Sequence, residues 1–180
     1  MNPQHIILIG FKNTGKSTIG MALAKELERP FVDLDEKIQE AHAAQTGGKI
    51  RLSCRKIMEI HGEEHFRTLE HEALKSILET KKPLVLAVGG GTPMMPANRE
   101  LLAKQSVVQV SAPKAIVFER IMINGKPAFF PKNEEAIDSF RRLWKEREPV
   151  FKKLAAITVE NTGSVDDAVA QILKFIINNL

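Results

Sequence analysis

The sequence has 180 residues, of which 43% are hydrophobic and 27% charged, and its formal net charge is +4. These values are ordinary for a soluble globular protein and exclude a wholly disordered chain. A chain of this length buries roughly 70% of its surface on folding, so a single domain over residues 1–180 needs no disulfide or metal to hold it together.

Composition also bounds the compartment and the partners. The single cysteine, Cys54, cannot form an internal disulfide, which favours a reducing compartment. Residues 1–5 lack the basic region of a signal peptide, and the uncharged run 83–98 is too short and too broken by glycine and proline to span a bilayer. Acidic and basic residues alternate over 134–148, as on a solvated surface. We therefore expect a cytoplasmic monomer that binds small anionic substrates, with neither a nucleic acid nor a membrane as partner.

The first elements in chain order are a strand, a helix and a second strand. Residues 5–9 form a short apolar run rich in β-branched side chains, which predicts a strand buried on both faces. A helical pattern starts near Lys16, with Ile19, Leu23 and Leu27 on one face. Residues 31–33 follow Pro30 and predict the second strand.

The central part of the chain predicts helices over 34–44, 53–60 and 63–80. A Thr46-Gly47-Gly48 break follows the first of them, and residues 84–88 predict a third strand that leads directly into three glycines. Two further strands are expected at 107–110 and 156–159. The last helix is the clearest, because apolar residues recur at helical spacing from 165 to 177 and a capping box stands before them.

Strands that alternate with helices pair in parallel through right-handed crossovers, which predicts a layered α/β domain. Residues 124–132 break the pattern with Gly125, Pro127, Phe129 and two neighbouring residues. We expect a mobile lid there, spanning about 121–135.

A phosphate-binding loop connects the first strand and the first helix. The sequence Gly10-Phe11-Lys12-Asn13-Thr14-Gly15-Lys16-Ser17 satisfies the pattern G-x-x-x-x-G-K-[ST], and Thr18 follows it. The glycines permit backbone angles that point successive N–H groups at phosphates, the lysine reaches the outer phosphates, and Ser17 offers a hydroxyl to Mg²⁺. A plain strand-to-helix turn would not need this combination. The loop predicts ATP binding, but GTPases, nucleotide kinases and transport ATPases share it.

Four further stretches carry polar side chains that this loop does not explain: Asp33 with Asp35, the run Gly62-Glu63-Glu64-His65-Phe66-Arg67-Thr68-Leu69-Glu70, the triplet Gly89-Gly90-Gly91, and Arg147-Glu148-Pro149-Val150-Phe151 with Ala155. Alternation along a strand would put Asp33 and Asp35 on the same side, so that both could serve one site. Each stretch also has a simpler interpretation. These are, in turn, a pair of helix-capping acids, a helical ion-pair ladder around Arg67, a flexible turn and an exposed arginine.

Together with the phosphate loop, these stretches resemble the shikimate kinase family in both content and order, from residue 6 to about 160. The resemblance implies a three-layer α/β/α P-loop kinase fold that transfers the γ-phosphoryl group of ATP to the 3-hydroxyl of shikimate, with Mg²⁺ as cofactor. It also implies the role of each stretch. Asp33 supports the Mg²⁺ held by Ser17, and Asp35 binds the ring hydroxyls and accepts the departing proton. The carboxylate is clamped by Arg67 and Arg147, and the floor of the substrate site is formed by Gly89, Gly90 and Gly91. Arg120 lies near the adenine.

Two positions depart from the family's pattern. Asn13 stands where most relatives have glycine, and asparagine tolerates a positive φ better than most residues, so a functional loop is still expected. Lys126 stands where the family's lid has an arginine that touches the transferring phosphate. Lysine keeps the charge but lacks the planar fork, which puts the catalytic rate in question.

Three alternatives remain open. A kinase of the gluconate or nucleoside type also pairs a P-loop with a small hydroxylated acceptor, although two separate arginines favour a carboxylate. A nucleotide-binding relative with weakened catalysis is suggested by the lysine-bearing lid. The net positive charge alone suggests an ATP-driven nucleic-acid protein, which salt-dependent retention of single-stranded DNA would support.

Overall fold

The computed structural model describes residues 5–48, 50–123, 125–127, 129–131 and 133–179. Residues 1–4, and Asn124, Ala128 and Lys132 of the expected lid, lie outside the described residues. The elements in chain order are β1 (Ile6–Ile9), α1 (Lys16–Glu26), β2 (Phe31–Asp33), α2 (Leu34–Gln45), α3 (Cys54–Leu78), β3 (Val85–Ala87), the 3-10 turn η1 (Thr92–Met94), α4 (Pro96–Leu102), β4 (Ser106–Ser111), α5 (Lys114–Met122), α6 (Ala136–Leu154), β5 (Ile157–Glu160) and α7 (Val165–Asn179).

The five strands form one parallel sheet in the order β2-β3-β1-β4-β5. The first strand is central: its Ile7 is level with Leu86 of β3 on one side and with Val107 of β4 on the other. All strands therefore end at the same edge of the sheet, which is where open α/β sheets bind ligands.

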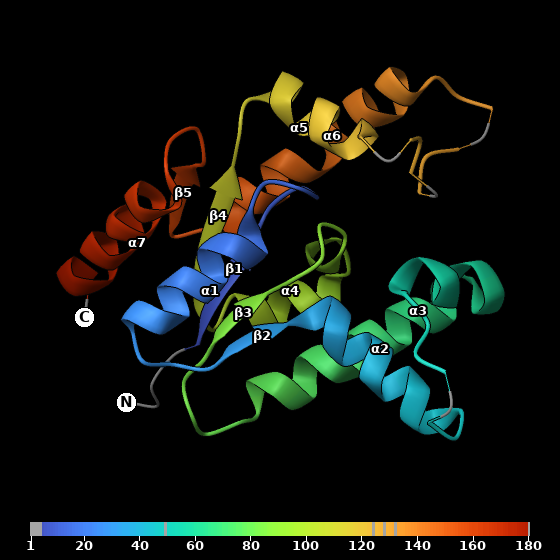
Figure 1. Cartoon of the computed structure of the whole chain (residues 1–180), viewed down its shortest axis with the longest axis horizontal. Helices are drawn as coiled ribbons and strands as arrows, with labels where there is room; N and C mark the ends of the chain where they lie inside the picture. Colours follow the sequence, from blue (N-terminus) through green and yellow to red (C-terminus); the bar gives the residue numbers. More distant parts are fainter. Residues whose placement is uncertain (1–4, 49, 124, 128, 132, 180) are drawn as a thin grey trace.

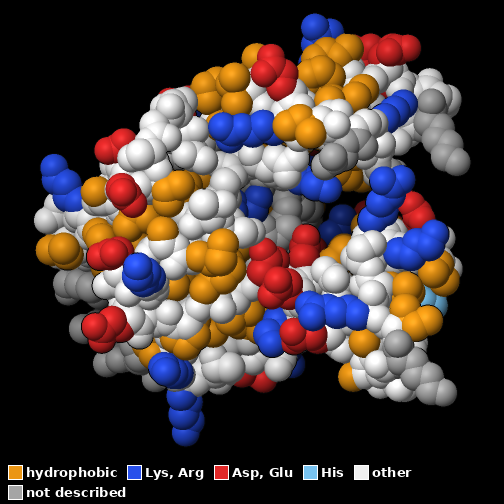
Figure 2. All heavy atoms as spheres, in the orientation of Figure 1, with side chains coloured by type: hydrophobic (Ala, Val, Ile, Leu, Met, Phe, Trp, Pro, Cys, Tyr) orange, Lys and Arg blue, Asp and Glu red, His pale blue; other side chains and the backbone are white. Residues whose placement is uncertain are grey.

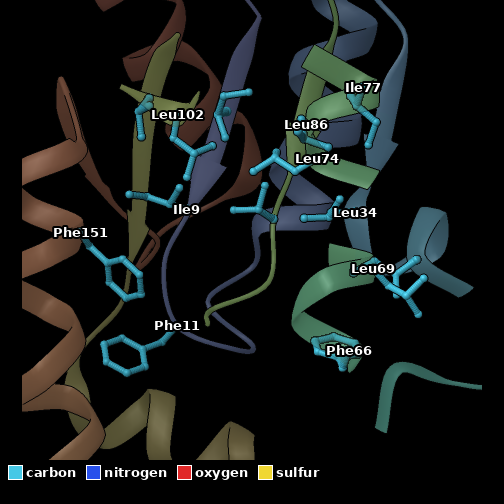
Figure 3. Packing of buried hydrophobic residues seen from close by; sticks show 14 of the residues in the cluster. Ile9, Phe11, Leu34, Phe66, Leu69, Leu74, Ile77, Leu86, Leu102 and Phe151 are labelled. Carbon is cyan, nitrogen blue, oxygen red and sulfur yellow. The ribbon is translucent and has the colours of Figure 1, made fainter. Parts of the chain in front are cut away.

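Hydrophobic side chains on the two faces of the sheet build two separate cores, because successive residues of a strand point to opposite faces. Ile6 and Leu8 of β1 pack in a cluster with α1 and α7. Ile7 and Ile9 pack in the other cluster, with helices α2 to α6. Figure 3 shows part of this second cluster, from Leu102 and Leu86 down to Phe11, Phe66 and Phe151. The chain thus has the predicted three-layer α/β/α arrangement (Figure 1).

Most predicted elements are confirmed within one or two residues. The helices predicted over 53–60 and 63–80 are one element, α3, interrupted at Gly62, which has the non-helical angles φ 84° and ψ 169°. Gly47 and Gly48, at the predicted break after α2, both have positive φ. The capping box before α7 is also confirmed, because the Asp167 N–H donates to Ser164 Oγ and the Ser164 N–H donates to Asp167 Oδ2, both at 3.1 Å.

Helices α4, α5 and α6 were not predicted. A signal for α6 exists, since Phe140, Trp144 and Phe151 recur at helical spacing, and Phe140 and Phe151 are buried. The dense charges between these aromatic residues masked the pattern. Among the described helices, none is both long enough and apolar enough to cross a membrane.

Candidate active site

A cavity of about 510 Å³ opens where the strands β1, β2 and β3 end. Figure 2 shows it as a hollow in the surface, with Lys and Arg side chains inside it and Asp and Glu side chains along its lower edge. In Figure 1, α5 and α6 lie above this region, and α2 and α3 lie at the lower right. The lining includes residues from the phosphate loop, from both aspartates, from α3, from the glycine triplet and from α6: Lys12, Asn13, Lys16, Ser17, Asp33, Asp35, Phe66, Arg67, Glu70, Gly89, Gly90, Gly91 and Arg147.

The phosphate loop has the backbone that its glycines predict. Gly10 has φ +140°, and a Cβ there would lie 2.2 Å from the carbonyl oxygen of Val110. Gly15 has φ +98°, and a Cβ there would lie 2.3 Å from Asn161 Nδ2. Asn13 has φ 62°, the left-handed angle that asparagine was expected to accept. Both glycines are therefore required, because a Cβ at either position would clash with a neighbouring segment of the chain.

The Lys16 ammonium lies inside this loop. Its Nζ donates hydrogen bonds to the carbonyl oxygens of Gly10 and Phe11, at 3.1 and 2.6 Å. Burial lowers the pKa of Lys16 to about 8, against the opposing effect of the nearby Asp35 and Asp33 carboxylates. A bound polyphosphate would strengthen the charged form, because an anion close to an ammonium raises its pKa.

Ser17 and Asp33 meet at the edge of the loop. Ser17 Oγ donates to Asp33 Oδ2 at 2.8 Å, and Asp33 also caps α2 by accepting from the Asp35 N–H at 3.0 Å. The expectation that strand alternation puts both aspartates on one side is wrong, because β2 ends at Asp33 and Asp35 lies in the first turn of α2. The capping geometry brings both carboxylates to the cavity instead.

Asp35 is open to the cavity but closely surrounded by protein. Desolvation raises the pKa of its carboxyl, and the carboxylates of Asp33 and Glu70 raise it further. A raised pKa makes a carboxylate a better proton acceptor, which is the role expected of Asp35.

Arg67 is held by acids on its own helix, as the ion-pair ladder predicted. Its Nη1 donates to Glu70 Oε2 at 2.8 Å and its Nη2 to Glu63 Oε1 at 3.4 Å. Glu70 is only 1% exposed, and its other oxygen accepts from Thr92 Oγ1 at 2.7 Å. The glutamate therefore fixes the guanidinium against the turn that follows the glycine triplet.

Arg147 projects from α6 into the same cavity. Burial lowers the pKa of its guanidinium, and the positive charge of Arg67 lowers it further. Within the described ranges, no hydrogen bond or ion pair neutralises the Arg147 guanidinium. Two neighbouring arginines, of which one has no anion, form a site for a carboxylate.

The glycine triplet lies next to the side chains of Asp35, Arg67 and Arg147. A Cβ on Gly89 would lie 3.3 Å from Asp35 Oδ1, one on Gly90 3.7 Å from Arg147 Nη1, and one on Gly91 2.8 Å from Arg67 Nη2. A side chain at position 91 would displace the Arg67 guanidinium, and side chains at 89 and 90 would take up space beside Asp35 and Arg147.

The remaining predicted residues lie around the cavity. Thr14 is buried within the loop and donates to the Phe11 carbonyl oxygen at 3.0 Å, and Thr18 is exposed on the first turn of α1. Arg120, at the end of α5, donates to the Asn13 carbonyl oxygen at 3.4 Å and accepts at its own carbonyl from Asn13 Nδ2 at 2.8 Å. Lys126 is exposed, hydrogen-bonds to the Glu134 carbonyl oxygen and is not among the lining residues described above.

Two contacts and one lining residue of the cavity were not predicted from the sequence. Phe11 stacks on Trp144 with ring centroids 4.4 Å apart, which ties the phosphate loop to the helix that carries Arg147. Asn161, after β5, donates to the Thr14 carbonyl oxygen at 2.9 Å. Cys54 lines the cavity, but burial raises the pKa of its thiol to about 12, so it stays protonated at neutral pH. All three depend on tertiary packing, for which the sequence holds no local signal.

The parallel sheet, the loop at the end of its central strand, and the ionised cavity beside it define a P-loop nucleotide-binding phosphotransferase. A sequence model of the shikimate kinase family matches residues 12–177. The chain belongs to the shikimate kinase family.

Individual relatives agree with this assignment. The chain is 34% identical to a shikimate kinase of Francisella tularensis subsp. holarctica, over 97% of this chain and 95% of that one. It is 31% identical over 94% of its length to a bifunctional shikimate kinase/3-dehydroquinate synthase of Thermotoga maritima, of which it spans 32%. Among solved structures, a shikimate kinase of Acinetobacter baumannii in complex with shikimate matches with a TM-score of 0.82 and 34% identity, over 98% of this chain and 94% of that chain.

Proposed function

We propose that this chain transfers the γ-phosphoryl group of ATP to the 3-hydroxyl of shikimate. The observation that carries the proposal is that Asp35, Arg67 and Arg147, from three different helices, line one cavity with the phosphate loop. A ring-sized acid with hydroxyl groups fits that combination of charges. The similar protein from Acinetobacter baumannii, solved with shikimate, supports this acceptor.

In the proposed complex, the ATP phosphates bind the amides of the loop 10–17 and the ammonium of Lys16, and Arg120 lies beside the adenine. The contact between Arg120 and Asn13 supports that position, because it places the guanidinium at the outer edge of the loop.

Mg²⁺ is the proposed cofactor, held by Ser17 and Asp33. An octahedral Mg²⁺ with oxygen ligands at about 2.1 Å keeps neighbouring oxygens roughly 3 Å apart. The two side-chain oxygens are 2.8 Å apart, so they fit two adjacent positions around such an ion. When bound, the ion would neutralise charge on the β- and γ-phosphates.

The acceptor would bind with its carboxylate between the two guanidinium groups, while Asp35 takes its ring hydroxyls. The bond between the γ-phosphorus and the bridging oxygen of ADP breaks, the bond between the acceptor oxygen and the γ-phosphorus forms, and the hydroxyl proton passes to the Asp35 carboxylate. Positioning and charge neutralisation supply most of the catalysis in such transfers. The raised pKa of Asp35, caused mainly by desolvation, suits it to receive that proton.

A panel of acceptors tests the proposal. The rate of ADP formation with Mg²⁺ and ATP is measured with shikimate, gluconate and nucleosides. Strong stimulation by shikimate alone is expected, and its loss in Asp35→Asn. Preference for gluconate or a nucleoside would refute the acceptor. Tight ATP binding without stimulation by any acceptor would favour a weakened nucleotide-binding relative, which the position of Lys126 outside the cavity lining suggests.

We further propose that the protein acts as a cytoplasmic monomer. All the lining residues belong to one chain, so no second copy is needed to complete the site. Light scattering at micromolar concentration checks this, and a dimer would contradict it.

A further inference from the structure

Phosphoryl transfer needs positive charge beside the transferring phosphoryl group, and in this structure Lys126 does not line the cavity. Negative charge spreads over the oxygens of the transferring phosphoryl group, and fixed cations stabilise it. Lys126, the lid cation expected from the sequence, hydrogen-bonds to the Glu134 carbonyl oxygen instead. Another side chain of the cavity is better placed for this role.

Lys12 is that side chain. It lies in the phosphate loop between Phe11 and Asn13 and lines the cavity. Its backbone is fixed, because Phe11 is buried against Trp144 and the Lys12 nitrogen lies 3.4 Å from where a Cβ on Gly90 would be. Its ammonium lies 5.9 Å from the centre of the Phe129 ring, which comes from the lid. The side chain therefore extends from the phosphate loop toward Phe129, and both residues line the cavity.

The charge of Lys12 acts on two groups of the proposed reaction. Burial is the main cause of the lowered pKa of Lys16, and the positive charge of Lys12 contributes to it. Desolvation is the main cause of the raised pKa of Asp35, and Lys12 opposes that rise. Lys12, Lys16 and Asp35 all line the same cavity, which puts the ammonium within electrostatic reach of both groups.

The Lys12 ammonium is also available. In the part of the chain that the structure describes, it makes no ion pair and no hydrogen bond to a protein acceptor. By contrast, Arg67 is paired with Glu70. Arg147 lies next to Gly90, where the acceptor's carboxylate is proposed to bind. An unpaired ammonium on a flexible stem, facing a cavity for anions, is suited to contact a phosphate.

We propose that Lys12 is a second catalytic lysine of this site, whose ammonium contacts the transferring phosphoryl group between Lys16 and Asp35. This rests on the proposed kinase function and deepens it. Lys12 exchanges no proton and no covalent bond: it adds positive charge while the bond to the bridging oxygen breaks and the bond to the acceptor oxygen forms. The Phe129 ring, 5.9 Å from the ammonium, would exclude water around it and so strengthen its effect.

Steady-state kinetics on matched variants test this proposal. Lys12→Met removes the charge but keeps the length of the side chain, and Lys12→Arg keeps the charge. Lys25→Met makes the same change at an exposed position near the end of α1, far from the cavity lining. With shikimate as acceptor, we expect Lys12→Met to lower kcat about a hundredfold with little change in either KM, because loss of one fixed transition-state donor typically costs that much. Lys12→Arg should keep most of the activity, and Lys25→Met all of it.

Three results would overturn the proposal. The first is a kcat of Lys12→Met within twofold of the unsubstituted protein. The second is an unchanged kcat with a raised KM for shikimate, which would make Lys12 a binding group for the acceptor. The third is a large loss confined to Lys126→Met, which would return the catalytic charge to the lid.

A second measurement separates this proposal from the proposed acceptor. If the unsubstituted protein does not phosphorylate shikimate, the proposed acceptor is wrong. The role of Lys12 is then decided by the affinity for the complex of ADP, Mg²⁺ and aluminium fluoride, in which the fluoride mimics the transferring phosphoryl group. Binding at least tenfold weaker in Lys12→Met than in Lys25→Met supports the proposal. Equal affinities refute it.

Discussion

Lys16, Asp35 and Arg147 each carry a charge that their surroundings disfavour. Burial lowers the pKa of Lys16 and of Arg147, and desolvation raises that of Asp35. Such shifts concentrate at functional sites, where a ligand supplies the missing opposite charge. At this scale the site is a set of charges that anionic ligands would complete.

The pKa of Lys16 predicts how ATP binding depends on pH. With a pKa of about 8 in the free protein, Lys16 loses its proton as the pH rises above 8, whereas an ordinary lysine stays charged to about 10.5. ATP needs the charged form, so its affinity should fall about tenfold between pH 7 and pH 9. Titration with ATP at constant Mg²⁺ measures this, with Lys16→Met as a pH-independent control. A constant affinity up to pH 9.5 in the unsubstituted protein would contradict it.

Removing either clamp arginine should impair the acceptor and leave the nucleotide unaffected. Arg67→Ala or Arg147→Ala leaves the acceptor's carboxylate without a charged partner, a loss of at least ~2 kcal/mol, or roughly thirtyfold in kcat/KM for shikimate. The affinity for ATP should stay within about twofold of its value in the unsubstituted protein. Arg141→Ala, on the exposed face of α6, is the matched control. An unchanged kcat/KM in both clamp variants would exclude the carboxylate site.

At the scale of elements, α3 and α6 carry the two arginines and face each other across the site. Helix α6 is tied to the phosphate loop by the stack of Trp144 on Phe11, and Figure 3 shows Phe11 and Phe151 side by side at the same junction. Helix α3 is tied to the glycine turn by Glu70 and Thr92. The nucleotide site and the acceptor site therefore share their supports.

A group of three histidines joins α2 to α3 and predicts how the stability of this helix pair depends on pH. His42 is 3% exposed, its Nε2 lies 3.1 Å from His61 Nε2, and the His65 ring is 5.0 Å from that of His61. Burial, followed by the charges of His61 and His65, lowers the pKa of His42 below 6.5. The unfolded chain therefore binds more protons than the folded one near pH 6, and stability should fall as the pH drops below 6.5.

Thermal unfolding from pH 7.5 to 5.5 measures this effect. We expect the unfolding temperature to fall with pH in the unsubstituted protein and to fall less in His42→Leu. His5→Leu, a buried histidine in another part of the fold, is the control and should keep the full pH dependence. Identical pH dependence in His42→Leu and the unsubstituted protein would show that His42 is not the responsible group.

How much of these elements the sequence predicts depends on where each signal lies. The apolar run of β1 and the glycines at 10 and 15 are local signals, and both predictions are confirmed. The strand-alternation argument for Asp33 and Asp35 is wrong, because the strand ends at the helix cap Asp33, two residues before that argument required. Helix α6 was missed because its charges hid three well-spaced aromatic residues.

At the scale of the whole molecule, five stretches spread over the chain meet at one edge of the sheet. Sequence order alone predicts that edge, because parallel strands end together. It does not predict which lysine lines the cavity, since the positions of Lys12 and Lys126 depend on how the loop and the segment around residue 126 fold. The orientation of long charged side chains is a tertiary property.

Product analysis tests the central claim most directly. The protein is incubated with ATP, Mg²⁺ and shikimate. ADP is quantified, and the shikimate product is examined by phosphorus and proton NMR. We predict one shikimate monophosphate for each ADP, with the phosphorus coupled to the proton on carbon 3. ADP formed with free phosphate and unmodified shikimate, or no ADP at all, would contradict the account.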